Sequence, residues 1–246
     1  MIMKVNGFVK TNQQGSKSNG QINGTEVRNI VDTDIIGDNH IATSIDTPMR
    51  EDAFVLSDEQ KIATIEVKFR EIMETLGLDL RDDSLNGTPH RVAKMFVQEI
   101  FSGLNPGNSP KISVFENKFQ YGEMLVEKNI NLNSTCEHHF LPIVGKAHVA
   151  YVSSGEVIGL SKINRIVDFF SRRPQVQERL TVQIASELRR ILKTEDIAVV
   201  IDAKHMCVSS RGIEDESSST ITAEYSGVFK RQDRKDEFLK YIALGR

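Results

Sequence analysis

The chain has 246 residues, of which 39% are hydrophobic, so it is long enough to bury a core as one large domain or two small ones. Its 31 basic and 34 acidic side chains give a formal net charge of -3, which provides no overall attraction to nucleic acid or to a membrane surface. Because Trp is absent and only 7% of the residues are aromatic, a platform for stacking nucleobases is not expected.

Cysteine content and hydropathy narrow the class of protein further. The two cysteines, Cys136 and Cys207, are too few for a disulfide framework in a chain of this length. The N-terminus lacks the apolar core of a secretory signal, and no stretch reaches the roughly 18 apolar residues of a membrane span. We therefore expect a soluble, cytoplasmic protein with reduced thiols and without nucleic-acid or membrane partners.

The composition divides the chain into three segments. Residues 1–55 are rich in Asn, Gly, Ser, Thr and Asp without a sustained apolar period, which predicts a flexible N-terminal extension. The one regular element that this pattern allows is a short docked strand at 30–31 or 35–36. Residues 56–110 are predicted to form an N-terminal helical segment, and residues 111–246 the main domain.

The helical segment contains two predicted helices. The first spans 57–77 and carries an apolar stripe over 62–76. The second begins at Thr88, its predicted cap, with Pro89 as the first helical residue, and it ends at Gly103. The buried face of this second helix is predicted to consist of Val92, Met95, Phe96 and Ile100.

The main domain, unlike the helical segment, is predicted to contain both strands and helices. The order of three strands, two helices, two strands and a last polar helix predicts an α+β fold with mainly antiparallel pairing. The predicted strands are 124–132, 143–152, 157–160, 197–206 and 220–229, and the predicted helices are 161–171, 174–193 and 234–244.

Cysteine and histidine occur together at two places that are far apart in the chain. Cys136 and His139 are three residues apart, so one turn can present both to a metal ion, and Cys207 supplies a third ligand. Three protein ligands leave one position of a zinc tetrahedron open for water, which is typical of a catalytic zinc. His138 and His205 flank these residues, and two imidazoles beside such a site suit proton transfer near neutral pH.

The spacing of His205 and Cys207 places both on one face of the strand predicted for 197–206 and its continuation. Two other interpretations of the whole pattern stay open. In the first, the cysteines are small buried hydrophobic residues and the histidines lie on the surface without a metal. In the second, His138 or His205 is a fourth ligand, and the zinc site is structural. The signature of zinc nucleobase deaminases does not match, because its second cysteine pair is absent.

Basic residues gather in three places that together suit a polyphosphate. Ser161 is a predicted helix cap whose free N–H groups favour an anion, and Lys162 and Arg165 follow it on one side of the helix. The alternative interpretation of each cation is that it lies on a solvated basic face and binds no phosphate. The remaining candidates are Arg211, which follows the second cysteine, and the helical pair Arg91 and Lys94.

Gln177 and Glu178 lie near the start of the helix predicted for 174–193. One interpretation is that Glu178 stabilises the helix dipole. The other is that its carboxylate accepts from the N1–H and 2-amino groups of a guanine. The sequence alone does not choose between them.

Seven segments together resemble the GTP cyclohydrolase I family, over a stretch from about residue 58 to the C-terminus. The segments are DSL at 83–85, TPHRVAKM at 88–95, STCEHHF at 134–140, GLSKINRIV at 159–167, RPQVQERLT at 173–181, HMCV at 205–208 and SRG at 210–212.

This resemblance implies a specific fold, reaction and set of site residues. The fold would be the tunnelling fold, an antiparallel sheet with helices packed on one side, assembled into a toroidal homodecamer with sites at subunit interfaces. The reaction would open the ring of GTP with Zn²⁺ as cofactor, and would give 7,8-dihydroneopterin triphosphate and formate. The implied roles are zinc ligands for Cys136, His139 and Cys207, catalysis for His138 and His205, guanine recognition for Gln177 and Glu178, and ribose and triphosphate contacts for Ser161, Lys162, Arg165, Arg211, Arg91 and Lys94.

Two competing functions remain at this point. The first is a zinc-stapled nucleotide-binding protein without turnover, against which the two non-ligand histidines argue. The second is a related tunnelling-fold enzyme that acts on another purine or pterin, against which Lys162, Arg165 and Arg211 argue.

Overall fold

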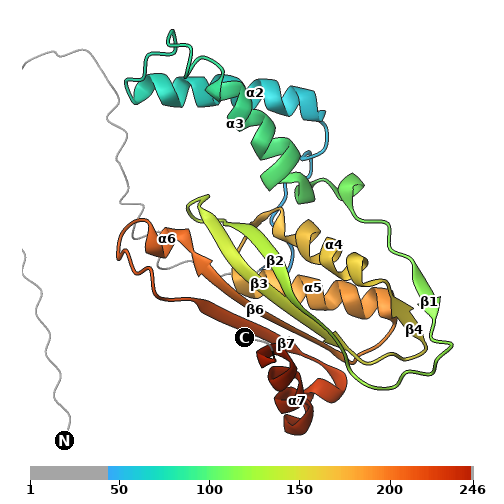
Figure 1. Cartoon of the computed structure of the whole chain (residues 1–246). Coiled ribbons are helices and arrows are strands. Elements are labelled where there is room, and N and C mark those ends of the chain that lie inside the picture. Colours follow the sequence, from blue (N-terminus) through green and yellow to red (C-terminus); the bar gives the residue numbers. More distant parts are fainter. Residues whose placement is uncertain (1–43, 245–246) are drawn as a thin grey trace, which may run out of the picture. The chain divides into compact units, whose positions relative to one another are not determined.

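The computed structural model describes residues 44–244, and the structural statements below concern that part of the chain (Figure 1). The strand predicted at 30–31 or 35–36 lies outside the described residues. Residues 44–55, the described end of the predicted extension, contain turns but neither helix nor strand. The division of the chain at 55 and 110 stays a prediction. No helix within residues 44–244 is long and apolar enough to cross a membrane.

Helix α2 (Asp58–Thr75) begins where the sequence predicts. Ser57 and Gln60 form a capping box, in which the Gln60 N–H donates to Ser57 Oγ over 3.3 Å and the Ser57 N–H donates to the Gln60 side chain over 2.9 Å. Gly77, at a φ of 84°, directly follows the C-cap Leu76 and prevents α2 from continuing. Ile62 of the predicted stripe is buried, but three later members are exposed: Val67, Ile72 and Leu76.

Helix α3 (Thr88–Met95) corrects the predicted cap by one residue. Its N-cap is Gly87, and Thr88 is already helical. The Thr88 hydroxyl accepts from Arg91 Nη2 over 2.9 Å and does not cap the backbone. The predicted buried face is only half-buried, whereas Pro89 and Ala93 are fully buried. The chain continues as a π-helical turn and two short 3-10 turns, at Phe96–Ile100, Ser102–Leu104 and Pro106–Asn108.

The main domain is built on a five-stranded sheet in the order β5-β2-β3-β6-β7. All neighbours pair antiparallel except β5, which runs parallel to β2. A separate two-stranded sheet pairs β1 with β4. The strands are β1 (Val114–Glu116), β2 (Leu125–Cys136), β3 (Pro142–Tyr151), β4 (Glu156–Ile158), β5 (Pro174–Gln175), β6 (Ile197–His205) and β7 (Thr220–Tyr225).

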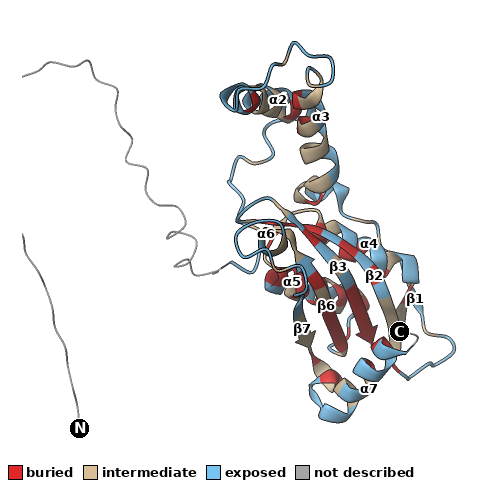
Figure 2. Cartoon of the chain, turned by 60° about the vertical axis from the view of Figure 1, so that its left-hand side comes forward, coloured by how far each residue is buried: buried red, intermediate tan, exposed pale blue. Residues whose placement is uncertain are grey.

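Two long helices cover one face of this sheet, α4 (Leu160–Ser171) and α5 (Gln177–Leu192) (Figures 1 and 2). Alternate residues of β6 explain the layering, because Ile197, Val199 and Ile201 face the core shared with both helices, whereas Ala198 and Val200 face the other side. On that other side lies the C-terminal helix α7 (Gln232–Ala243), preceded by a 3-10 turn at Gly227–Lys230. The predicted α+β class and tunnelling fold are confirmed.

The antiparallel register gives the sheet two distinct ends. At the His205 end, His205 pairs with Ile143, and at the Ile197 end, Ile197 pairs with Tyr151. Gly145 allows β3 and β6 to approach closely, because a Cβ there would lie 2.1 Å from the Asp202 carbonyl oxygen.

Helices α4 and α5 run between these two ends in opposite directions. Helix α4 follows β4 at the Ile197 end and leads into β5, which pairs with Thr135–Cys136 at the His205 end (Figure 1). Its 12 residues span about 18 Å. Helix α5 then starts at the His205 end and returns.

Three predicted boundaries near the site are wrong. Helix α4 begins at Leu160 with Gly159 as N-cap, so Ser161 is not a cap. Helix α5 begins at Gln177, not at 174, because Pro174 and Gln175 pair with β2 and Val176 is the N-cap. Strand β6 ends at His205, and Cys207 lies on a helical turn, α6 (Met206–Ser209), that the Ser210 N–H closes by donating to the Met206 carbonyl over 2.9 Å.

Candidate metal centre and substrate site

The metal turn, residues 136–141, connects β2 to β3 at the His205 end of the sheet. The Phe140 N–H donates to the Cys136 carbonyl over 2.9 Å, and the Cys136 N–H donates to the Leu141 carbonyl over 2.8 Å. Phe140 adopts a φ of 53°, which is uncommon for a residue with a Cβ. These bonds fix a tight loop in which Cys136 is buried and His139 is exposed.

Cys207 faces this turn from α6. Ligand atoms of Cys136, His139 and Cys207 all lie within 4.8 Å of one another, so one metal ion could contact all three. Burial, followed by the nearby Cys136 thiol, raises the pKa of Cys207 to about 11. A metal ion must therefore displace a proton from this thiol when it binds.

The donor set is suited to a borderline-soft cation. Two sulfurs and one imidazole nitrogen are ligands that zinc accepts at short distances in a tetrahedral arrangement, whereas magnesium and calcium prefer oxygen. Within residues 44–244 the group comprises these three ligands, which leave a coordination position for a small molecule. The cluster thus fits a metal that takes part in chemistry.

Two further predicted residues lie beside the cluster. His138 Nδ1 lies 3.8 Å from Cys136 Sγ. Arg211 Nη1 lies 2.9 Å from His139 Nε2, and the Arg211 charge lowers the pKa of Cys207 in opposition to burial. Arg211 is therefore the one predicted triphosphate cation with a described contact to a proposed metal ligand.

His205 is oriented by Gln177. The Gln177 amide nitrogen donates to the carbonyls of Ile201 and Thr220 over 3.2 and 2.8 Å, which directs the amide oxygen toward His205 Nε2 at 2.8 Å. Because an amide oxygen only accepts, Nε2 must carry a proton, and Nδ1 is the nitrogen left to exchange one in the neutral ring. Burial lowers the pKa of His205, and the charge of Glu178 opposes that effect.

Glu178 is exposed and lines a cavity of about 190 Å³. Val176 and Val182 provide apolar walls, and Ser44 and Ile45 border the same cavity. A carboxylate between apolar surfaces suits a flat heterocycle with N–H groups on one edge. Gln177, by contrast, is 1% exposed, and its amide is bonded within the protein.

The other predicted basic residues do not join this group within one chain. Ser161 lies in the first turn of α4, at the Ile197 end, and Lys162 Nζ donates to the Lys111 carbonyl over 2.9 Å. Arg165 lines a separate cavity of about 260 Å³ that also contains Asp168 and Arg172. On α3, Arg91 donates to the Ser84 carbonyl and the Thr88 hydroxyl, and Lys94 is exposed.

Sequence reasoning missed a buried ion pair behind the metal turn. Arg179, whose side chain is 5% exposed, donates to both carboxylate oxygens of Glu137. The available signal was weak: Arg179 and Gln183 are polar residues four apart in α5, and each directly precedes a buried apolar residue, Leu180 or Ile184.

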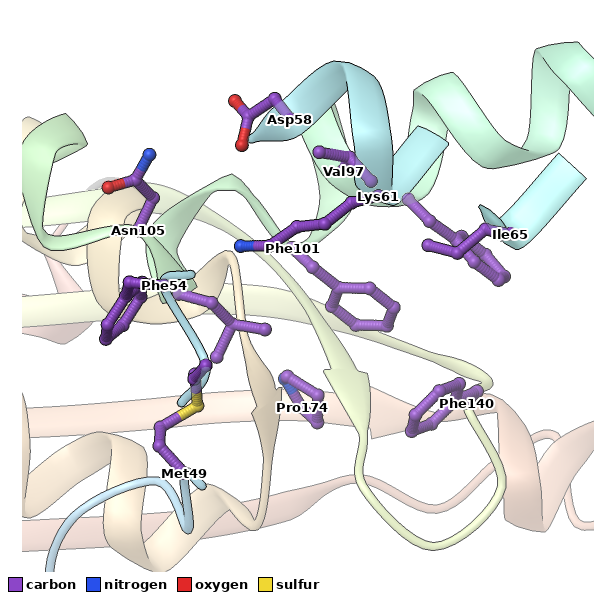
Figure 3. A pocket seen from close by; sticks show the side chains of 13 residues that line it. Met49, Phe54, Asp58, Lys61, Ile65, Val97, Phe101, Asn105, Phe140 and Pro174 are labelled. Atoms are coloured by element: carbon purple, nitrogen blue, oxygen red, sulfur yellow. The ribbon is translucent and has the colours of Figure 1, made fainter. Parts of the chain in front are cut away.

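An apolar pocket of about 470 Å³ adjoins the same turn (Figure 3). Figure 3 shows Phe101, Phe140 and Pro174 around it, together with Met49 and Phe54 from the segment that precedes α2. The rings of Phe101 and Phe140 lie 5.2 Å apart between centroids, which ties the helical segment to the metal turn.

Comparisons with known proteins agree with the geometry. The family model described as GTP cyclohydrolase I matches residues 65–243. A protein named GTP cyclohydrolase 1 from Flavobacterium johnsoniae is 62% identical over 211 residues, covering 86% of this chain and 95% of that protein. Proteins of the same name from Aeromonas salmonicida and Citrobacter koseri are 56% and 52% identical, covering 80% and 82% of this chain and 90% and 91% of their own.

Proposed function

The chain belongs to the GTP cyclohydrolase I family, and from this premise we propose how its residues act on GTP. The enzyme is a hydrolase of the EC 3.5.4.16 type, which converts GTP to 7,8-dihydroneopterin triphosphate and formate at the start of pterin and tetrahydrofolate biosynthesis. The observation that carries the proposal is the group formed by Cys136, His139 and Cys207, with His205 and Glu178 beside it.

Cys136, His139 and Cys207 would hold a zinc ion. Their two sulfurs and one imidazole, with ligand atoms within 4.8 Å of one another, support that identity. When bound, zinc lowers the pKa of a coordinated water, which is the chemistry that hydrolysis at guanine C8 needs near neutral pH. The third protein donor comes from α6, so the site depends on the fold of two distant segments.

His205 and His138 would move the protons. With Nε2 of His205 bonded to Gln177, Nδ1 would accept a proton from water and pass it to guanine N7, which makes C8 more electrophilic and returns the ring to its neutral form. His138 lies next to ligand His139 and near Cys136, where it would carry protons during ring opening and the release of formate. Rearrangement of the ribose and closure of the new ring then complete the pterin.

Glu178 would recognise the guanine. Its exposed carboxylate beside Val176 and Val182 supports two hydrogen bonds from the N1–H and 2-amino groups of the base, with apolar contacts on the ring faces. Gln177 is the predicted partner in this recognition, but its amide is buried and bonded within the protein, so it would act on the guanine by orienting the His205 ring.

The triphosphate and ribose would be held by residues from more than one copy of the chain. Arg211 approaches the metal group of its own chain, whereas Ser161 lies in the first turn of a helix of about 18 Å whose opposite end approaches that group. Ser161, Lys162 and Arg165 of one copy, and Arg91 and Lys94 of another, would therefore complete the site. The open edge of β7, which pairs only with β6 within residues 44–244, and the exposed stripe of α2 support assembly, for which we propose a toroidal homodecamer in the cytoplasm.

Incubation of zinc-loaded protein with GTP tests the function directly. We expect formate and, after oxidation, a fluorescent pterin, both of which stop when the metal is removed by a chelator and return when zinc is added. A zinc-loaded protein that binds GTP but releases no formate would overturn the proposed function.

A further inference from the structure

Two chains of hydrogen bonds connect the metal turn to the strap, which we define as residues 44–46. In the first, Arg179 donates through both terminal nitrogens to the Glu137 carboxylate and through Nε to the Ser44 carbonyl over 3.0 Å. The buried guanidinium of Arg179 thus bonds both to Glu137 of the metal turn and to Ser44, which lies 135 positions before Arg179 in the chain.

The second chain passes through two buried glutamines. The Glu137 N–H donates to the Gln175 carbonyl over 3.0 Å, and the Gln175 side chain donates to the Gln183 amide oxygen over 2.8 Å. The Gln183 amide nitrogen then donates to the Ile45 carbonyl over 3.1 Å. Gln175 is 0% exposed and Gln183 5%, so these amides have no water to replace lost partners.

The geometry of Arg179 makes this network rigid. Its planar guanidinium uses Nε, Nη1 and Nη2 together, and a carboxylate and a carbonyl fix the plane from two sides. A buried charge held in this way tolerates little displacement, because loss of one partner leaves the other without solvation. Glu137 is therefore anchored through its carboxylate and its backbone at once.

The strap also lies beside the substrate cavity. Ser44 and Ile45 border the space that Glu178 lines, and further along the same segment Met49 and Phe54 share the apolar pocket with Phe140 of the metal turn (Figure 3). The segment before α2 thus contacts both flanks of the site.

We infer that Arg179 is a positioning residue that links the strap to Glu137, and that through Glu137 it sets the geometry of His138 for catalysis. His138 Nε2 lies 3.9 Å from Glu137 Oε1, one of the two carboxylate oxygens that Arg179 holds. The inference deepens the proposed function and rests on it, since His138 is the proton carrier there. The strap is then part of the site, and the Glu137–Arg179 ion pair positions a catalytic residue in addition to stabilising the fold.

The test compares full-length, zinc-loaded variants at equal zinc occupancy. For Arg179→Met and for Glu137→Leu we expect kcat for formate release to fall by about 100-fold, as a misplaced catalytic group costs, while KM for GTP changes little. Arg179→Met should also speed amide hydrogen exchange in both the strap and the metal turn. A control is Arg231→Met, which removes an ion pair with Asp233 whose side chains are 65% and 59% exposed, and it should leave kcat and exchange in the strap and the metal turn unchanged.

The double variant Glu137→Leu, Arg179→Met separates positioning from stability. Apolar residues of similar size often replace a buried ion pair without loss of stability, so its unfolding temperature should recover toward that of the natural protein. We expect kcat to stay low, because the link to the strap is gone. Recovery of kcat together with stability, or single variants with the natural kcat, would overturn the inference, whereas absence of formate release by the natural protein would instead defeat the proposed function.

Discussion

The metal turn and the first turn of α4 both contain segments that resemble the GTP cyclohydrolase I family, but they contribute to the site in different ways. At the His205 end, one chain brings together the metal group, two histidines, Glu178 and Arg211. At the Ile197 end, Ser161 and Lys162 have no described contact with that group, and Lys162 binds the Lys111 carbonyl instead.

Under the proposed function, this contrast separates the residues that carry out the chemistry from those that bind the triphosphate. Groups that must be aligned within a fraction of an ångström for bond breaking come from strand ends and turns of one rigid core. Charges that hold a flexible polyphosphate tolerate looser placement, so a second copy can supply them. Changes at the His205 end should therefore abolish turnover, and changes at the Ile197 end should weaken binding.

The largest effect is expected from removal of a proposed metal ligand. Cys207→Ala leaves one sulfur and one imidazole, too few to hold zinc firmly, so formate production should fall by more than the roughly 10,000-fold that loss of a proton-transfer residue costs at most. Zinc per chain, measured by atomic absorption, should fall in parallel. A variant that turns over GTP without bound zinc would show that the metal group is not the chemical centre.

His205→Ala should have the next largest effect. Because Nδ1 of His205 is the proposed proton-exchanging atom, kcat should fall by about 100- to 10,000-fold while zinc content stays unchanged. Measurement of zinc and formate on the same preparation decides the role. Loss of zinc would make His205 a ligand, and unchanged formate release would remove it from catalysis.

Glu178→Gln tests the base-reading carboxylate with a smaller expected effect. Replacement of an ionised acceptor by an amide should weaken GTP binding by about 10- to 100-fold and leave zinc content unaltered. Glu187→Gln on the same helix is the matched control, since Glu187 pairs with the exposed Arg190 and should not affect affinity. Equal GTP affinity in Glu178→Gln and the natural protein, by calorimetry, would contradict the assignment.

The parts of this molecule that could be predicted from sequence are those whose cause is local. The capping box of Ser57 and Gln60, the end of α2 just before Gly77, and the short spacing of Cys136 and His139 each depend on neighbours within a few residues. The position of Cys207 on a helical turn was missed, because the spacing of His205 and Cys207 fits a strand equally well.

Long-range partners could not be predicted for a physical reason. The bond of Gln177 to His205 exists because two carbonyls from β6 and β7 orient its amide, and the pairing of Arg179 with Glu137 depends on the parallel contact of β5 with β2. No periodicity within α5 encodes those neighbours. The distance of Ser161 from the metal group was likewise not predictable from the sequence. It depends on which end of the sheet lies next to each end of α4, and only the folded structure determines that.

The smallest expected effect comes from a single triphosphate cation, and it gives the sharpest test of the contrast between the two ends. Arg165→Ala should weaken GTP binding about ten-fold, the cost of one charged hydrogen bond. If Arg165 acts in the site of another copy, co-assembly of Arg165→Ala with the inactive His205→Ala should create some sites that carry both natural residues. Mixed oligomers, refolded or co-expressed, should then show the natural KM in a fraction of their turnover. Such a low-KM component cannot arise if Arg165 and His205 of the same chain form one site, because every active His205 would then sit with the altered residue 165.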